Sequence, residues 1–138
     1  MHKIAVILVM ILLPLAILAQ DAGKISLMSQ EIGQNLSQIV KGEERIERPV
    51  FIFLYEPDTS ESDYIRASYF QQEGLQAVME KNRYQQFFVE AHSVVGLELS
   101  QKCNISSYPT FIALKPQKKD WEVLQVKTVE DLISQLSN

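Results

Sequence analysis

Apolar residues in this chain fall in short runs separated by charged or turn-forming segments. The clearest run is VFIFLY (residues 50–55), which is rich in β-branched and aromatic residues and lies between two prolines. Its length and composition predict a strand buried on both faces, at the centre of a sheet with helices on either side. Further runs at 86–91 and 110–114 predict two more strands, the first of them also buried. Alternation over 121–126 predicts an edge strand.

Between these strands, apolar residues recur at helical spacing. Residues 63–82 predict a long helix that Gly74 divides, and 96–103 a short one. Helices are also predicted around 32–40 and from Thr128, which has an acidic residue three positions later, as in a capping box. The resulting order predicts a compact α/β sandwich. Its first two strands should run parallel, because βαβ crossovers are right-handed.

The N-terminus is a separate segment. A basic start precedes an unbroken apolar run of 16 residues, 4–19, which is shorter than the roughly 20 that a spanning helix needs. This pattern predicts a signal peptide over 1–19 and a mature domain over 20–138, exported to a periplasm, the ER lumen or the medium. An uncleaved membrane anchor is the alternative, because Ile17 is large for the −3 position of a cleavage site.

Composition narrows the class of protein. The formal charge is −4, and it becomes −5 without the signal peptide, whose one charged residue is a lysine. An acidic domain has no basic footprint for nucleic acid. Cys103 is the only cysteine, so an intrachain disulfide is excluded and the core must form by hydrophobic packing. We identify no metal-ligand or cofactor motif.

Two segments carry a resemblance to a known family. ERPVFIFLYEP (47–57) resembles the strand that leads into the redox motif of thioredoxin-like proteins, and LSQKCNISSYPTFIAL (99–114) resembles their third helix, cis-proline loop and following strand. The resemblance covers 24–138. It implies a thioredoxin-like sandwich, with a central mixed β-sheet flanked by helices and a cis bond before Pro109. YFQQEGLQAVMEKN (69–82) is similar to a helix of the extended bacterial thioredoxin-like branch and of the non-catalytic UAS branch.

The reactive half of the family's site is not present. Laying the family pattern on the chain without a gap puts Thr59 and Ser62 at the two cysteine positions of CxxC, with Ser60 and Glu61 between them. Dithiol exchange needs one thiolate to attack and a second thiol to resolve the mixed disulfide. Hydroxyls do neither, so we expect no dithiol oxidoreductase activity.

Neighbouring positions also depart from the family. Phe53 stands where the family often has a buried carboxylate, and Asp58 where it usually has tryptophan. The simplest role for this loop is helix capping by Asp58, Ser60 or Ser62; a binding role for the hydroxyls is the alternative. A serine hydrolase is poorly supported, because His92 has no evident orienting carboxylate and no GxSxG elbow is present.

The cis-proline loop, the part of the family's site that this chain resembles, implies a binding role. In the family, a cis-proline loop exposes backbone on which an extended substrate pairs, as in β-augmentation. We therefore expect non-covalent binding of an extended or unfolded polypeptide, chaperone-like or scaffolding, with a protein or peptide as partner. The alternative is that SSYPTF persists only as architecture. The expected groove residues are Pro57, Asp58, Thr59, Tyr108, Pro109 and Thr110.

Two other functions stay open. One is a monothiol enzyme or redox sensor that uses Cys103, although burial as a small apolar residue is the simpler role for that thiol. The other is a membrane-tethered, lipid-responsive module, since the UAS branch includes fatty-acid-binding members; it requires an uncleaved N-terminus. Asn35 and Asn104 begin N-glycosylation triplets, and a glycan on Asn104 would block the groove.

Overall fold

The computed structural model describes residues 35–138 of the 138-residue chain. The chain divides into two units after Gln38, and the strands lie in the unit Ile39–Asn138. Residues 35–41 are helical, in agreement with part of the helix predicted around 32–40. The signal peptide or anchor predicted over 1–19 lies outside the described residues. Across 35–138, no helix combines the length and apolar character needed to cross a membrane.

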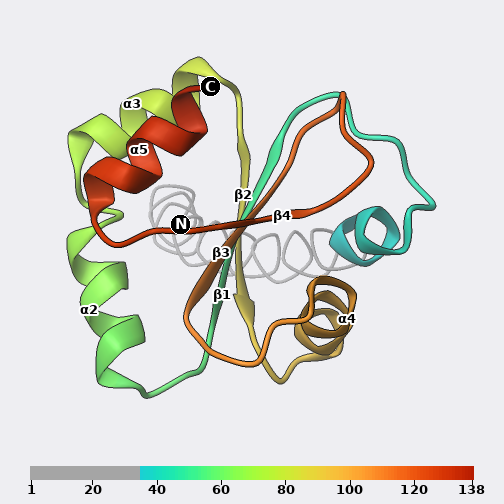
Figure 1. The fold of residues 1–138 in the computed structure, drawn as a ribbon, viewed down its shortest axis with the longest axis horizontal. Helices are drawn as coiled ribbons and strands as arrows, with labels where there is room; N and C mark the ends of the chain where they lie inside the picture. The colour runs from blue at the N-terminus through green and yellow to red at the C-terminus, as the bar shows by residue number, and fades with distance from the viewer. Residues whose placement is uncertain (1–34) are drawn as a thin grey trace, which may run out of the picture. The chain divides into compact units, whose positions relative to one another are not determined.

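A four-stranded mixed sheet forms the centre of this unit, with the strand order β2-β1-β3-β4 (Figure 1). β1 runs parallel to β2 and antiparallel to β3, and β3 is antiparallel to β4. The predicted parallel pairing of the first two strands is therefore confirmed. The strands are β1 (Val50–Tyr55), β2 (Gln85–Glu90), β3 (Thr110–Leu114) and β4 (Glu122–Leu124).

β1 is the buried central strand that the sequence predicted. Its residues from Val50 to Leu54 have no exposed surface. The prediction of a second fully buried strand at 86–91 was wrong. β2 lies at an edge of the described sheet, and Phe88 is 47% exposed. Its short apolar run resembles a central strand, but only one of its edges pairs with another strand of the described sheet.

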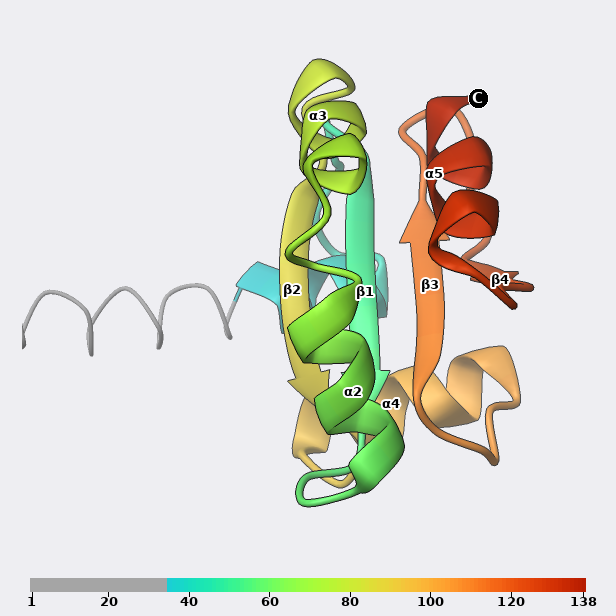
Figure 2. The same cartoon turned by 90° about the vertical axis from the view of Figure 1, so that its left-hand side faces the viewer.

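Helices cover both faces of the sheet. Figure 2 shows α2 (Ser60–Ser68), α3 (Glu73–Lys81) and α5 (Val129–Ser137) in front of the strands, and α4 (Val94–Cys103) behind them. On the α2 side, the rings of Phe51, Phe53, Phe70 and Phe111 pack together, with centroids 5.3 to 6.1 Å apart. Sandwich packing on both faces confirms the predicted α/β class.

The predicted helix over 63–82 is two helices, but Gly74 does not separate them. The break lies at residues 69–72, and Gly74 is the second residue of α3. A Cβ on Gly74 would lie 3.3 Å from Cδ1 of Ile133 on α5. This glycine therefore permits close packing of α3 on α5, and the chain turns before it.

Candidate functional site

The ends of three strands meet at one end of the sheet. β1 and β2 both end there, and antiparallel β3 begins there (Figure 1). The segments that follow or precede them are the loop before α2, the turn before α4 and the loop of Tyr108 and Pro109. The Tyr108–Pro109 bond is cis, as the family resemblance implied.

The loop before α2, where the family resemblance would place a redox motif, is held by Thr59. Its hydroxyl donates to the carbonyl of Glu56 at 3.2 Å and accepts from the backbone N–H of Ser62 at 3.4 Å, so it is the N-cap of α2. The prediction that Asp58, Ser60 or Ser62 caps this helix was wrong. Asp58 adopts φ 61° in the turn before the cap, and Ser60 is already the first helical residue.

Ser62, which the family resemblance aligns with the second cysteine of CxxC, points into the protein. It is 2% exposed, and its hydroxyl has no hydrogen-bond partner among residues 35–138. An unpaired buried hydroxyl costs about 1–3 kcal/mol, so this position is a local weakness in the core. The two positions that the resemblance aligns with the cysteine pair thus carry a helix cap and a buried hydroxyl.

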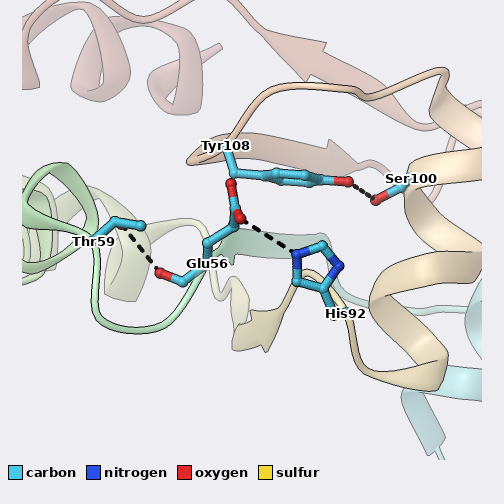
Figure 3. Close-up of polar contacts among 5 residues, drawn as sticks. All are labelled: Glu56, Thr59, His92, Ser100 and Tyr108. Atoms are coloured by element: carbon cyan, nitrogen blue, oxygen red, sulfur yellow. Dashed lines mark hydrogen bonds and ion pairs between the residues drawn. The ribbon is translucent and has the colours of Figure 1, made fainter.

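Two polar contacts and one aromatic contact join the three segments to each other and to α4 (Figure 3). His92 Nε2 lies 3.3 Å from Glu56 Oε2, and the His92 ring meets the Tyr108 ring edge-on with centroids 6.1 Å apart. The Tyr108 hydroxyl lies 2.8 Å from the hydroxyl of Ser100 on α4. Tyr108 is therefore held from two sides, by the imidazole and by α4.

This geometry corrects the expectation that His92 has no carboxylate beside it, and it supports the expectation that the site is not that of a serine hydrolase. His92 does have a carboxylate beside it, Glu56, although none was evident in the sequence. The signal was available, because each residue closely follows one of two neighbouring parallel strands. The Ser100 hydroxyl, however, bonds the Tyr108 hydroxyl and not the imidazole. The contacts therefore form no serine–histidine–carboxylate relay of the kind that activates a nucleophile.

Gly96 fixes α4 against the end of β2. A Cβ at this position would lie 2.1 Å from the Glu90 carbonyl oxygen and 2.7 Å from that of Ala91. Ser93 caps the helix by accepting the Gly96 N–H at 3.1 Å, and its hydroxyl donates to the Glu90 carbonyl at 2.6 Å. This close approach sets the position of His92, which lies between Ala91 and Ser93.

A groove of about 310 Å³ lies beside the cis-proline, between α2, the start of β3 and the chain that leaves β4. Buried and half-buried apolar side chains contribute to its lining, and polar groups include Glu61 and Lys127. The lining residues are Glu61, Ile65, Tyr69, Ser107, Pro109, Thr110, Phe111, Val123, Leu124, Gln125, Val126 and Lys127.

The structure separates the predicted groove residues into two groups. Pro109 and Thr110 line the groove, whereas Tyr108 directs its hydroxyl toward Ser100. Residues 57–59 form the loop before α2 and do not line the groove. The sequence did not point to the wall at 123–127, because nothing in a short polar edge strand marks it as part of a site.

The groove is open because β4 is short. The last pair between β3 and β4 joins Phe111 to Leu124, so Thr110 is paired with β1 but not with β4. Beyond β4, Tyr69 donates to the Lys127 carbonyl at 3.3 Å, and Asp131 accepts the Lys127 N–H at 3.0 Å. These bonds hold the departing chain to α2 and α5, and they leave one edge of Thr110 free of β4.

Cys103 and Asn104 lie at the end of α4. Burial raises the pKa of the half-buried Cys103 thiol, an effect that neighbouring Lys102 partly opposes. A raised pKa means less thiolate at neutral pH. Asn104 is exposed and ends α4 with φ 54°, and Asn35 lies in the helix of residues 35–41. Within the described residues, no group of three or more His, Cys, Asp and Glu could hold a metal ion.

Comparison with known proteins bears on the fold. Neither protein-family models nor curated protein sequences match this chain. Among solved structures, it is similar to the solution structure of a thioredoxin from Thermus thermophilus, with a TM-score of 0.54 and 17% sequence identity over 64% of this chain and 71% of that chain. The fold is therefore thioredoxin-like, as the resemblance implied. At this identity the similarity extends to the fold alone.

Proposed function

We propose that this protein is a redox-inactive thioredoxin-like domain that binds an extended or unfolded polypeptide non-covalently, as a chaperone-like or scaffolding module. The observation that carries the proposal is the free edge of β3 at Thr110, beside a groove of about 310 Å³. A protein or peptide is the expected partner. Export through the apolar N-terminal segment is part of the proposal, and it rests on the sequence alone.

An extended peptide fits this edge on physical grounds. Unpaired backbone groups at the edge of a sheet form a template for another strand, whose backbone bonds supply affinity. Alternate side chains of such a strand point to the same side, so some would enter the groove beside Ile65 and Phe111. These two side chains are 8% and 5% exposed and offer apolar contact at the base of the groove.

The former redox positions also support a non-covalent role. The Thr59 hydroxyl is already used by the α2 cap, and Ser62 is buried. Neither is a thiol, and the chain's one cysteine lies elsewhere, at the end of α4. The raised pKa of Cys103 argues against the monothiol alternative, since it lowers the fraction of reactive thiolate.

Site-specific photocrosslinking tests the proposal. A benzophenone amino acid would replace Gln125, an exposed groove residue, and in a matched variant Glu73, an exposed residue outside the groove. Each variant would be irradiated with reduced, carbamidomethylated ribonuclease A, which is permanently unfolded and has no thiol. We expect crosslinks from position 125 and few from position 73.

Two controls make the result decisive. Native ribonuclease A should crosslink weakly, because its strands are already paired. Ser107→Trp places a large side chain in the groove at an exposed position and should abolish the crosslinks from position 125. Equal crosslinking from both positions, or crosslinking that survives Ser107→Trp, would contradict binding in the groove.

A further inference from the structure

We infer that Ser100 is a positioning residue for the groove: its hydrogen bond to Tyr108 holds the cis-proline loop in the conformation that receives an extended polypeptide. This inference rests on the proposed function, since it names the residue that prepares the site of that function for its ligand. Ser100 lies on α4 and does not line the groove, so it acts on binding through Tyr108 and the loop.

The chain between α4 and the cis-proline is tied to α4 at two points, and Ser100 provides both. Asn104 turns the chain back with φ 54°, and the Ile105 N–H donates to the Ser100 carbonyl at 2.8 Å. Three residues later, the Tyr108 hydroxyl lies 2.8 Å from the Ser100 hydroxyl (Figure 3). The segment from Ile105 to Tyr108 is thus bound at both of its ends to one residue.

Ser100 can serve as this anchor because its own position is fixed. It is 8% exposed, and it lies one turn after Gly96, whose close approach to the carbonyls of Glu90 and Ala91 sets α4 against the end of β2. Hydrogen bonds are stronger where water is largely excluded, as it is around the Ser100 hydroxyl. Ser100 therefore links the position of α4 to the position of the loop.

The loop that Ser100 holds supplies part of the groove. Ser107, Pro109 and Thr110 line the groove, and Tyr108 lies among them in the chain with its hydroxyl directed to α4. Holding the Tyr108 side chain therefore restricts the backbone on both sides of it. A site that is ordered before binding avoids the loss of conformational entropy that a mobile loop incurs when it binds. Breaking the bond at Ser100 should thus weaken binding, although Ser100 itself does not line the groove.

Binding measurements on variants of the full-length protein test the inference. Isothermal titration calorimetry with reduced, carbamidomethylated ribonuclease A gives the dissociation constant. We expect Ser100→Ala and Tyr108→Phe each to raise it about fivefold, the effect of losing one hydrogen bond. The double variant should bind as weakly as either single variant, because both changes remove the same bond.

Two control variants lie at the other end of the sheet, before β2 begins. Tyr84→Phe removes a tyrosine hydroxyl from a buried residue outside the groove. Asn82→Ala removes the hydrogen bond from the Asn82 amide to the Leu136 carbonyl at 2.9 Å, and so lowers stability without touching the loop. Both variants should bind the unfolded ribonuclease with the wild-type affinity.

NMR relaxation of the free protein gives a readout that a loss of stability alone would not change. In Ser100→Ala, the ¹H–¹⁵N NOE values of the Ser107 and Thr110 amides should fall, because the loop gains fast motion. In Asn82→Ala, these values should stay at those of the wild type. Unchanged values in Ser100→Ala would mean that the bond does not order the loop, and would contradict the inference.

The binding results separate the two claims. Wild-type affinity of Ser100→Ala, together with loss of binding on Ser107→Trp, would overturn the positioning role and leave groove binding intact. An equal loss of affinity in Asn82→Ala would also overturn the positioning role, since lower stability would then explain the effect. Wild-type binding that Ser107→Trp does not reduce would overturn both claims.

Discussion

The Thr59 hydroxyl makes two hydrogen bonds, to the Glu56 carbonyl and from the Ser62 N–H. A cysteine at the same place could not accept the backbone N–H as well, because sulfur is a weak acceptor. The Thr59 side chain, which the resemblance aligns with the first cysteine of CxxC, therefore serves the local fold. At the scale of single residues, the threonine at this position caps a helix.

Removing this cap should lower stability measurably. Thr59→Ala leaves the first turn of α2 without its side-chain acceptor and should lower the free energy of unfolding by about 1 kcal/mol. Thr59→Ser retains the hydroxyl and should stay close to the wild type. Urea denaturation followed by circular dichroism measures both. Equal stability of the alanine and serine variants would show that the hydroxyl does not cap the helix.

Replacing Ser62 with alanine should change stability in the opposite direction. Its buried hydroxyl has no partner within the described chain, so Ser62→Ala should raise the free energy of unfolding by about 1 kcal/mol. Ser60→Ala, at an exposed position two residues earlier on the same helix, controls for the difference in helix propensity between serine and alanine. A loss of stability on Ser62→Ala beyond that control would mean that the hydroxyl is satisfied.

Cys103 should react slowly in the folded protein. Burial raises the pKa of its thiol, and a pKa above the ordinary value leaves less thiolate at pH 7, where only the thiolate is alkylated. The rate of alkylation by iodoacetamide, measured by mass spectrometry, should rise as the pH increases toward that pKa. It should also be faster in urea. Alkylation in the native state at the rate of the unfolded chain would revive the monothiol hypothesis.

At the scale of elements, the sequence predicted where strands and helices lie better than what ends or covers them. The apolar run at 50–55 identified the central strand, because a short unbroken run of apolar residues between two prolines fits a strand buried on both faces. The prediction of a buried strand at 86–91 was wrong. The exposure of a strand depends on how many other strands pair with it, and an apolar run does not contain that information. The prediction that Gly74 divides the helix was wrong, because a glycine can permit close packing as well as break a helix. Here it lies against Ile133.

The two helical glycines should therefore respond differently to alanine. Gly96→Ala drives a Cβ into the carbonyl oxygens of Glu90 and Ala91, which are backbone atoms, and should lower stability by about 3 kcal/mol. Gly74→Ala meets only the tip of a flexible isoleucine, and the better helix propensity of alanine offsets that contact, so the change should stay within about 1 kcal/mol.

Thermal and urea denaturation of both variants checks this difference. A Gly96→Ala protein as stable as the wild type would mean that α4 does not pack directly on the end of β2. His92 and Tyr108 would then have to be positioned in some other way.

At the scale of the whole molecule, the sequence resemblance identified the cis-proline loop, the part of the site that depends on backbone conformation. The cis bond before Pro109 follows from a local motif, so it could be predicted. The wall at residues 123–127 depends on how distant segments meet, so it could not be read from one motif. The pairing of Glu56 with His92 could have been expected, because each residue closely follows one of two neighbouring parallel strands. Together these parts give a thioredoxin-like fold with an open groove and no thiol in it.

The most direct test of non-covalent binding in this groove is NMR spectroscopy of the ¹⁵N-labelled protein with Cys103→Ser, during titration with reduced, carbamidomethylated ribonuclease A. The account predicts saturable shifts of the backbone amides of Thr110, Gln125 and Val126, although no thiol is present, and their loss with Ser107→Trp. Shifts confined to the other end of the sheet, or shifts that require Cys103, would contradict it.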